Sequence, residues 1–285
     1  MIFAAISGNL RPICRKGSRL VARKLTLLAG LIAPSLAGGA VACDGLVDGP
    51  RGTITEIVDG DTVFFDNGLQ IRLIGMQAPK LPLGRDGFET WPLADEARGY
   101  LSDLTLGQRA VLRYGGERID RNGRSLGHLF LEDGDVWLQA ELIGAGMGRV
   151  YSFADNRKCL GELLAAEARA RAEGIGVWSD DYYAIRNAQN PAALLPLEGH
   201  YELVEGRVLE AGQANGRIYL NFGRLWREDF TLVIDPPAQS LFEDAGIDLL
   251  GLGGALIRAR GWIEIADGPR IAVTHPEQLE FLSSR

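Results

Sequence analysis

Acidic and basic side chains that could act on a phosphate ester lie close together between residues 58 and 80. Asp59 and Asp61 belong to a VDGDTV turn, Arg72 lies in the strand-like IRLIG segment, and Lys80 ends the segment QAPK. A guanidinium group binds phosphate oxygens through two parallel, charge-assisted hydrogen bonds. Carboxylates are ligands that calcium prefers. Residues of these types could neutralise a phosphoryl group beside a metal ion or an activated water molecule.

Together with Arg124 in the downstream DRNGRSLG segment, these motifs resemble the thermonuclease (staphylococcal-nuclease-like) family, whose calcium-dependent enzymes cut phosphodiesters in DNA and RNA. The family pattern is roughly DGDTV, then RLxGxDxPE, then YGRxL. The resemblance covers about residues 52 to 178 and includes a closing Gly-x-x-x-Trp178. It implies an OB-type barrel and a nucleic acid or other phosphodiester ligand. It also implies that Arg72 and Arg124 are phosphate clamps and that Asp61 is a metal ligand.

Two positions depart from the family pattern. Gln77 stands where the family has a metal-binding Asp, and Lys80 stands where it has a catalytic Glu. Calcium takes six to eight oxygen ligands, usually including several carboxylates. Gln77 offers only a neutral amide oxygen, and Lys80 adds a positive charge. We therefore expect poor calcium binding and weak or absent calcium-dependent nuclease activity.

Lys80 has two interpretations. In the first, its ammonium occupies the vacant calcium position, pairs with Asp61 and presents a fixed cation to a phosphate beside Arg72 and Arg124. In the second, Lys80 points into solvent from its loop, as most lysines do. The turn residues also have structural interpretations, because Asp59 can shape the turn through hydrogen bonds to backbone amides.

Two alternative functions remain open. Asp59, Asp86 and Glu89 could supply replacement carboxylates if the 81–89 loop folds inward, which would give an active phosphodiesterase. The chain could instead be a non-catalytic module of the cell envelope that binds a phosphate-bearing ligand or a protein partner.

Residues 1–42 have the order of a secretory signal peptide. They contain six of the 30 Lys and Arg residues and none of the 37 Asp and Glu residues, then an apolar run at 25–32 and small residues at 37–42. A proline and two glycines interrupt the apolar run before it reaches the roughly 20 residues that a membrane span needs. We predict export to the periplasm or the cell exterior, with no integral membrane span after cleavage.

Removal of that segment leaves a net charge of about −13, because 24 basic residues then face 37 acidic ones. A chain of this charge repels nucleic acid over a long range. Contact with DNA or RNA must therefore be local.

Two cysteines, Cys43 and Cys159, remain after residue 42. An even pair in an oxidising compartment favours a disulfide. Lipidation is an alternative, because the small residues that end in Ala42-Cys43 loosely resemble a lipobox. Free, buried thiols are the third interpretation.

The elements that must position these side chains follow a mainly β pattern with helices, as in an α+β protein. Asp66-Asn67-Gly68 is a hairpin signal between two strand-like runs. Helical patterns are expected at 93–104, 137–143 and 159–172. Strand-like runs lie at 52–58, 62–66, 69–74, 110–114 and 123–132. Five strands and three helices predict an OB-type barrel within a domain at 43–178.

A second β region follows a predicted linker at 179–200. Strand-like runs at 205–210, 217–222, 230–234, 255–265 and 270–274, with a helical pattern at 239–245, predict a smaller OB-like β-barrel domain at 201–285. Its arginines interleave with aromatic residues that include Trp226 and Trp262. This composition suits a face for single strands, but the acids in the same stretch favour an ordinary ion-paired surface.

Overall fold

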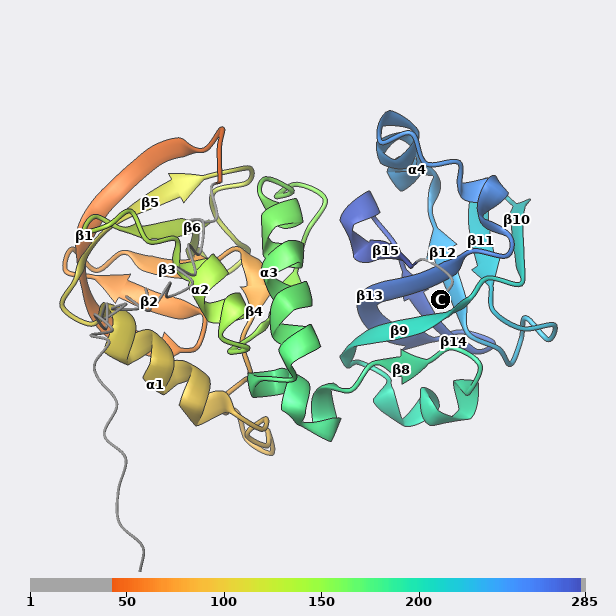
Figure 1. The fold of residues 1–285 in the computed structure, drawn as a ribbon, viewed down its shortest axis with the longest axis horizontal. Helices are drawn as coiled ribbons and strands as arrows, with labels where there is room; N and C mark the ends of the chain where they lie inside the picture. The colour runs from red at the N-terminus through yellow and green to blue at the C-terminus, as the bar shows by residue number, and fades with distance from the viewer. Residues whose placement is uncertain (1–42, 283–285) are drawn as a thin grey trace, which may run out of the picture. The chain divides into compact units, whose positions relative to one another are not determined.

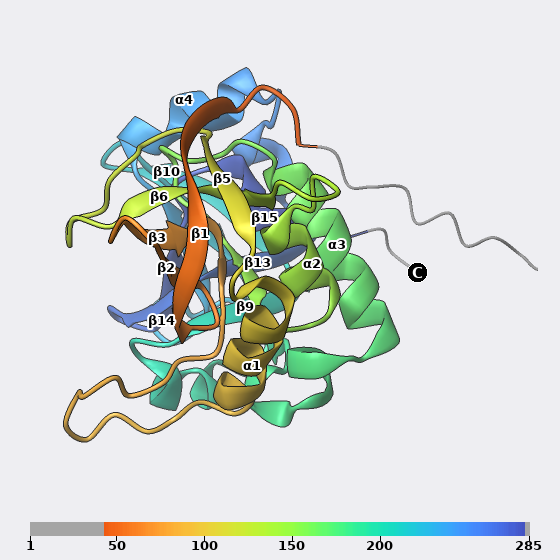
Figure 2. The same cartoon turned by 90° about the vertical axis from the view of Figure 1, so that its left-hand side faces the viewer.

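One long strand closes the first β-barrel. The structure, a computed structural model, describes residues 43–282, and the predicted signal peptide at 1–42 lies outside them. The strands of this barrel are β1 (Val47–Asp59), β2 (Thr62–Phe65), β3 (Gln70–Leu73), β5 (Arg109–Tyr114) and β6 (Ser125–Leu131). The first half of β1 pairs with β5 and its second half with β2, so the order β1-β2-β3-β6-β5 returns to its start (Figure 1). Figure 2 shows β1 as one long ribbon with β5 and β2 on either side.

Alternating apolar residues fill the interior of this barrel. Residues at every second position of a strand face the same side, so the predicted runs supply a continuous core. The fully buried members from the first three strands are Ile54, Val63, Phe65, Ile71 and Leu73. The predicted hairpin joins β2 to β3, with Gly68 at a φ of 79°.

Three helices accompany the barrel, as the sequence predicts. They are α1 (Ala94–Thr105), α2 (Leu138–Gly144) and α3 (Leu160–Glu173), and α3 ends at Gly174, whose φ is 64°. The sequence did not predict a small antiparallel sheet formed by β4 (Gly75–Gln77) and β7 (Arg149–Tyr151). Strands of three residues are too short to display a period-two pattern.

Short elements connect the two β regions. They are the 3-10 helices η1 (Gly176–Ser179), η2 (Asp181–Tyr183), η3 (Pro191–Ala193) and η4 (Leu195–Leu197), with strand β8 (Arg186–Asn187) between them. Pro191 and Pro196 each lie in the first turn of one short helix, where a missing N–H costs little. The segment packs closely, because the buried Tyr183 donates a hydrogen bond to the Pro92 carbonyl at 2.6 Å.

The second β region is a larger sheet with its own core. Its strands are β9 (Tyr201–Arg207), β10 (Glu210–Ala214), β11 (Arg217–Asn221), β12 (Thr231–Ile234), β13 (Leu256–Ile265), β14 (Pro269–Ala272) and β15 (Leu279–Leu282). Its helices are α4 (Pro236–Asp244), η5 (Leu249–Leu252) and η6 (Pro276–Gln278). The strand order is β10-β11-β12-β14-β13-β9-β8, with β15 beside β13.

The strand order of this second region is that of an OB fold. The sheet order β10-β11-β12-β14-β13-β9 begins with β10 and ends with β9. These two strands are consecutive in the sequence, separated only by Val208 and Leu209, so together they correspond to the single long strand β1 of the first barrel. The parallel pair β12 and β14 corresponds to the parallel pair β3 and β6 of the first barrel. The predicted fold class is therefore confirmed as an OB-type barrel with three helices and a second β domain. The sequence did not predict β8 and β15, which extend that second sheet.

A disulfide joins Cys43 to Cys159, with their Cα atoms 5.4 Å apart. It ties the start of the described chain to the residue before α3 and confirms the predicted pairing. Among residues 43–282, no helix combines the length and the apolar character needed to cross a bilayer.

Candidate functional site

A pocket of about 700 Å³ opens beside the ends of β3 and β4. Its wall also includes the loop after β4, the hairpin before β6 and the residues that end β7. The predicted residues that line it are Asp59, Arg72, Lys80 and Arg124. Segments far apart in the sequence therefore bring most of the predicted site residues to one cavity.

The VDGDTV turn places two acids beneath this pocket. Asp59 ends β1, and its carboxylate accepts a hydrogen bond of 3.1 Å from the backbone N–H of Asp61. Gly60 between them lies so close to α1 that an added Cβ would come within 2.9 Å of the Ala97 Cβ. The turn therefore requires glycine, and it buries both carboxylates.

Lys80 reaches back to both acids. Its Nζ atom donates hydrogen bonds to Asp61 Oδ1 at 2.7 Å and Oδ2 at 2.6 Å, and to Asp59 Oδ2 at 3.3 Å. Only 18% of the Lys80 side chain is exposed. The backbone N–H of Ala78 adds a further hydrogen bond of 2.8 Å to Asp61.

Arg72 approaches the same carboxylate from β3. One of its terminal nitrogens lies 3.2 Å from Asp61 Oδ2 and donates to the Met76 carbonyl at 2.9 Å. The other terminal nitrogen donates to the Leu73 carbonyl. These contacts fix the plane of the guanidinium group, which also borders the pocket.

The two acids have opposite pKa shifts. Burial opposes the charge of Asp61, but Arg72, Lys80 and the hydrogen bonds from Lys80 and Ala78 lower its pKa to about 2. Burial raises the pKa of Asp59, the charge of Asp61 raises it further, and Lys80 and Arg72 offset this only in part. At neutral pH, Asp61 is therefore a carboxylate whose charge Lys80 and Arg72 neutralise.

Gln77 is buried in β4, and it is not among the residues that line the pocket. Its side-chain oxygen is buried, with no hydrogen-bond partner among the described residues. A buried amide oxygen without a partner carries a desolvation cost.

Arg124 borders the pocket from the hairpin before β6. Its Nε atom donates a hydrogen bond of 2.7 Å to Asp120 Oδ2, and its backbone N–H donates one of 2.9 Å to Asp120 Oδ1. Burial raises the pKa of Asp120, but the bonds from Arg124 and Asn122 lower it overall. Within residues 43–282, no hydrogen bond or ion pair joins Arg124 to Asp61 or Lys80. Its own acidic neighbour therefore holds Arg124 on the pocket wall.

The 81–89 loop does not bring its acids to the pocket. Asp86 and Glu89 are exposed and lie outside the lining, whereas Arg85 of the same loop is part of it. In the described part of the chain, no three His, Cys, Asp or Glu side chains gather in a way that could hold a metal ion.

Three aromatic residues that the sequence analysis did not assign to the site complete the wall. Tyr151 ends β7, Phe153 follows two residues later, and Trp262 comes from β13 of the second domain. The alternation Tyr151-Ser152-Phe153 was a usable signal for a shared face. No sequence signal placed Trp262 at the pocket, because its position there depends on how the two domains pack against each other.

These features define the first domain as an OB barrel with a pocket that is lined by arginine and lysine side chains above a pair of buried acids. Residues 70–180 match the family described as "Staphylococcal nuclease homologue". The predicted resemblance is thereby confirmed, and this part of the chain is a staphylococcal-nuclease-like domain.

Curated relatives agree with this assignment. The thermonuclease of Staphylococcus intermedius is 26% identical over 135 residues, which cover 46% of this chain and 78% of the relative. The thermonuclease of Staphylococcus hyicus is 25% identical over 130 residues, which cover 45% of this chain and 75% of the relative. Endonuclease YhcR of Bacillus subtilis (strain 168) is 28% identical over 141 residues, or 46% of this chain and 12% of the relative. These three relatives are nucleases by name, and each aligns with less than half of this chain.

Calcium is the metal that the family typically uses. The residues present do not suit it, because calcium needs six to eight oxygens. The two carboxylates of the turn, Asp59 and Asp61, both accept hydrogen bonds from the Lys80 ammonium. Gln77, at the family's second acidic position, contributes no carboxylate. No chemical step through calcium is therefore assigned to this chain.

Proposed function

We propose that this chain is an exported staphylococcal-nuclease-like protein that binds a phosphate-bearing ligand and has weak or absent calcium-dependent nuclease activity. One observation carries the proposal: the Lys80 ammonium lies 2.7 Å and 2.6 Å from the two carboxylate oxygens of Asp61. A fixed cation thus stands where a metal ion would have to lie to use Asp61 as a ligand.

Electrostatics oppose calcium at this position. A divalent ion 4 Å from the Lys80 ammonium meets a repulsion of about 8 kcal/mol at an effective dielectric constant of 20. Displacing the lysine would also break the ion pair with Asp61. Either route weakens calcium binding by much more than one lost oxygen ligand would.

The basic side chains that line the pocket support phosphate binding. Five basic residues line the pocket, Arg72, Lys80, Arg85, Arg121 and Arg124, against four acidic ones. The pocket is therefore slightly positive, whereas the whole chain has a formal charge of −7, or about −13 without residues 1–42. Such a cavity suits a compact phosphate group, whereas the overall charge repels a long polyanion.

Export is part of the proposal. The charged, apolar and small-residue order of residues 1–42 is typical of a secretory signal peptide. The disulfide between Cys43 and Cys159 fits an oxidising compartment such as the periplasm or the cell exterior.

A cleavage assay tests the proposal. The protein without residues 1–42 is incubated with single-stranded DNA or RNA in calcium, in other divalent ions, or in chelator. Because the overall charge repels these long polyanions, we expect weak, salt-sensitive binding without calcium-dependent cleavage. Calcium-dependent cleavage that disappears in Arg124→Ala would overturn the proposal.

A gain-of-function variant sharpens this assay. Gln77→Asp combined with Lys80→Glu restores both acidic positions of the family pattern, and we expect it to gain calcium-dependent cleavage. Gln77→Asp alone is the matched control, because it keeps the lysine on Asp61 and should gain little. If the folded double variant remains inactive, the rest of the site is not intact.

The alternatives have less support. A phosphodiesterase that uses Asp59, Asp86 and Glu89 would need two exposed loop residues to enter the pocket. It predicts cleavage that depends on a divalent ion and is lost in Asp86→Asn. A protein-binding module predicts neither cleavage nor binding of phosphate ligands.

A further inference from the structure

The second domain contributes an aromatic side chain to the pocket of the first. Trp262 of β13 lines the same cavity as Arg72 and Lys80. Its indole N–H donates a hydrogen bond of 3.2 Å to the Tyr151 hydroxyl, and the two rings are perpendicular, with centroids 6.1 Å apart. Phe153 packs edge-on against Tyr151 at 4.8 Å. These three rings form what we call the aromatic wall of the pocket.

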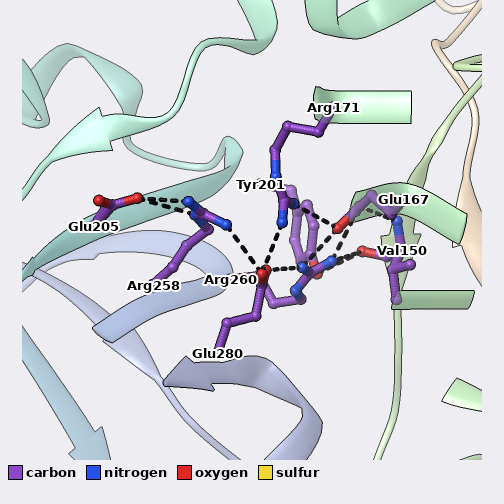
Figure 3. Close-up of polar contacts among 8 residues, drawn as sticks. All are labelled: Val150, Glu167, Arg171, Tyr201, Glu205, Arg258, Arg260 and Glu280. Atoms are coloured by element: carbon purple, nitrogen blue, oxygen red, sulfur yellow. Dashed lines mark hydrogen bonds and ion pairs between the residues drawn. The ribbon is translucent and has the colours of Figure 1, made fainter. Parts of the chain in front are cut away.

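Figure 3 shows the ion pair between Arg260 and Glu167 that joins the two domains. This ion pair lies next to the aromatic wall and holds it in place. Arg260 donates to the Val150 carbonyl at 3.2 Å and to both oxygens of Glu167, at 3.1 and 2.7 Å. Glu167 in turn accepts from the Val150 N–H at 2.7 Å. Residues two apart on a strand face the same side, so Arg260 and Trp262 both face β7. The clamp on Val150 therefore also positions Tyr151, its neighbour.

The aromatic wall is well placed for a ligand but only partly buried. Trp262 is 41% exposed and Phe153 is 43% exposed, and both border a cavity that also holds cationic side chains. Planar rings stack on exposed aromatic faces, and this stacking tolerates many ring types. Cationic side chains and aromatic rings in the wall of one pocket fit a phosphate ester that carries a planar ring.

We propose that Trp262 is a ligand-contacting residue of the pocket, and that the second domain thereby selects phosphate esters with a planar ring, that is, nucleotides. This inference rests on the proposed phosphate-binding function and deepens it. Trp262 lies outside the residues 70–180 that match the family, so the contact belongs to this combination of domains. The nucleotide can be free or can end a nucleic acid strand.

Two probes with the same sugar and phosphate test the proposal. Adenosine 5′-monophosphate carries a base, and ribose 5-phosphate does not. We expect Trp262→Ala to weaken binding of the nucleotide roughly 5- to 150-fold, the range for loss of one stacked base. Binding of ribose 5-phosphate should stay within about twofold, which also reports that the pocket remains folded. Titration calorimetry on the whole chain measures both affinities.

Trp226→Ala is the matched control. Trp226 also lies in the second domain and is 55% exposed, but it does not line this pocket. It should change neither affinity, while Trp262→Phe should keep most of the nucleotide affinity. Equal loss of both probes in Trp262→Ala would overturn the proposal, because the tryptophan would then support the pocket without contacting the ring.

Failure of the inference and failure of the proposed function are distinguishable. If the protein binds both probes equally, ring selection is wrong while the phosphate site stands. If it binds neither probe, both proposals fall. A 5′-phosphorylated tetranucleotide distinguishes a strand end from a free nucleotide as the ligand. If it binds more tightly than the mononucleotide, with the same dependence on Trp262, the ligand is the end of a nucleic acid strand. If the two bind equally, the ligand is the free nucleotide.

Discussion

The ammonium of Lys80 contacts both Asp59 and Asp61, and Asp61 has no exposed surface. A buried carboxylate costs several kcal/mol unless cations and hydrogen bonds compensate its charge. Arg72, Lys80 and the Ala78 N–H supply that compensation. Lys80 therefore stabilises the fold as well as opposing calcium.

Lys80→Met should lower the free energy of unfolding at pH 7 by about 3 kcal/mol, because it leaves Asp61 buried with only Arg72 as a counter-charge. The stabilisation from Asp61 is fully present above its ordinary pKa of 3.8 and is lost as the pH falls through about 2. The difference between the two proteins should therefore shrink between pH 4 and pH 2. Urea unfolding across this range measures it.

Lys158→Met is the control, because Lys158 is an exposed lysine of the same domain. It should change stability by less than about 0.5 kcal/mol. A loss for Lys80→Met that is equally small at pH 7 would mean that the lysine contributes little to the buried pair.

Single-residue chemistry was predictable where it depends on local sequence. Asp61 directly precedes β2 and Arg72 lies on β3, and one recognisable hairpin joins these two strands, so their proximity followed from the pattern. The ion pair between Arg124 and Asp120 is also local. It was not predicted, because the sequence of a turn does not show which of its charged side chains pair with each other. The burial of Gln77 was not predictable, because β4 pairs with a strand more than 70 residues away.

Strand β7 is the element that joins the two domains. Its residue Val150 is held through both its N–H and its carbonyl, by Glu167 of α3 and Arg260 of β13. The ion network continues to Glu280, which pairs with Arg260 and, at 2.8 Å, with Arg171. The side chains of Arg260 and Glu167 are almost completely buried. Such a pair is costly to break, because the remaining partner is left uncompensated.

Glu167→Gln should lower the free energy of unfolding by about 3 kcal/mol, because Arg260 loses the fully buried one of its two carboxylate partners. We also expect faster hydrogen exchange at the Val150 amide, which loses its charge-assisted hydrogen bond. Denaturant unfolding and amide exchange measure the two effects.

Glu173→Gln provides the comparison on the same helix, because Glu173 is exposed near its end. Its effect should stay within about 0.5 kcal/mol. Unchanged exchange at Val150 in Glu167→Gln would show that the clamp on β7 does not depend on this carboxylate.

Elements were predictable in proportion to their length. The runs that became β1, β2, β3, β5 and β6 are long enough for alternation to be visible, and Asn67-Gly68 marks their first hairpin. The strands β4, β7 and β8 have two or three residues each, so no period can be detected. The shortness of β7, which ends at Tyr151, is why that residue of the pocket wall was missed.

Contacts between the domains were beyond the reach of sequence patterns. Trp262 and Tyr151 are 111 residues apart, and His275 and Ser152 are 123 residues apart. Alternation predicts which side of a strand a residue faces, but it does not predict which other domain covers that side. The aromatic residues of the second domain therefore suggested a surface of that domain alone.

The protonation of His275 depends on the packing of the two domains, because this histidine is buried between them. It is almost completely buried, with Ser152 Oγ 2.7 Å from Nε2 and Thr274 Oγ1 2.9 Å from Nδ1. Burial lowers its pKa to about 4; Glu277 opposes this shift, while Arg157 and Arg260 add to it. Burial also lowers the pKa of His128 to about 4.

The stability of the whole molecule should fall as the pH drops from 6.5 to 4, because in this window the unfolded chain binds protons that the buried, neutral histidines exclude. Shifts from 6.5 to about 4 correspond to at most about 3 kcal/mol for each histidine. His275→Gln should flatten the profile by one such contribution, whereas the control His200→Gln, at a partly exposed position, should leave it unchanged. Unfolding curves at half-unit pH steps measure the slope. Parallel profiles for His275→Gln and the unmodified chain would mean that burial does not keep this histidine neutral.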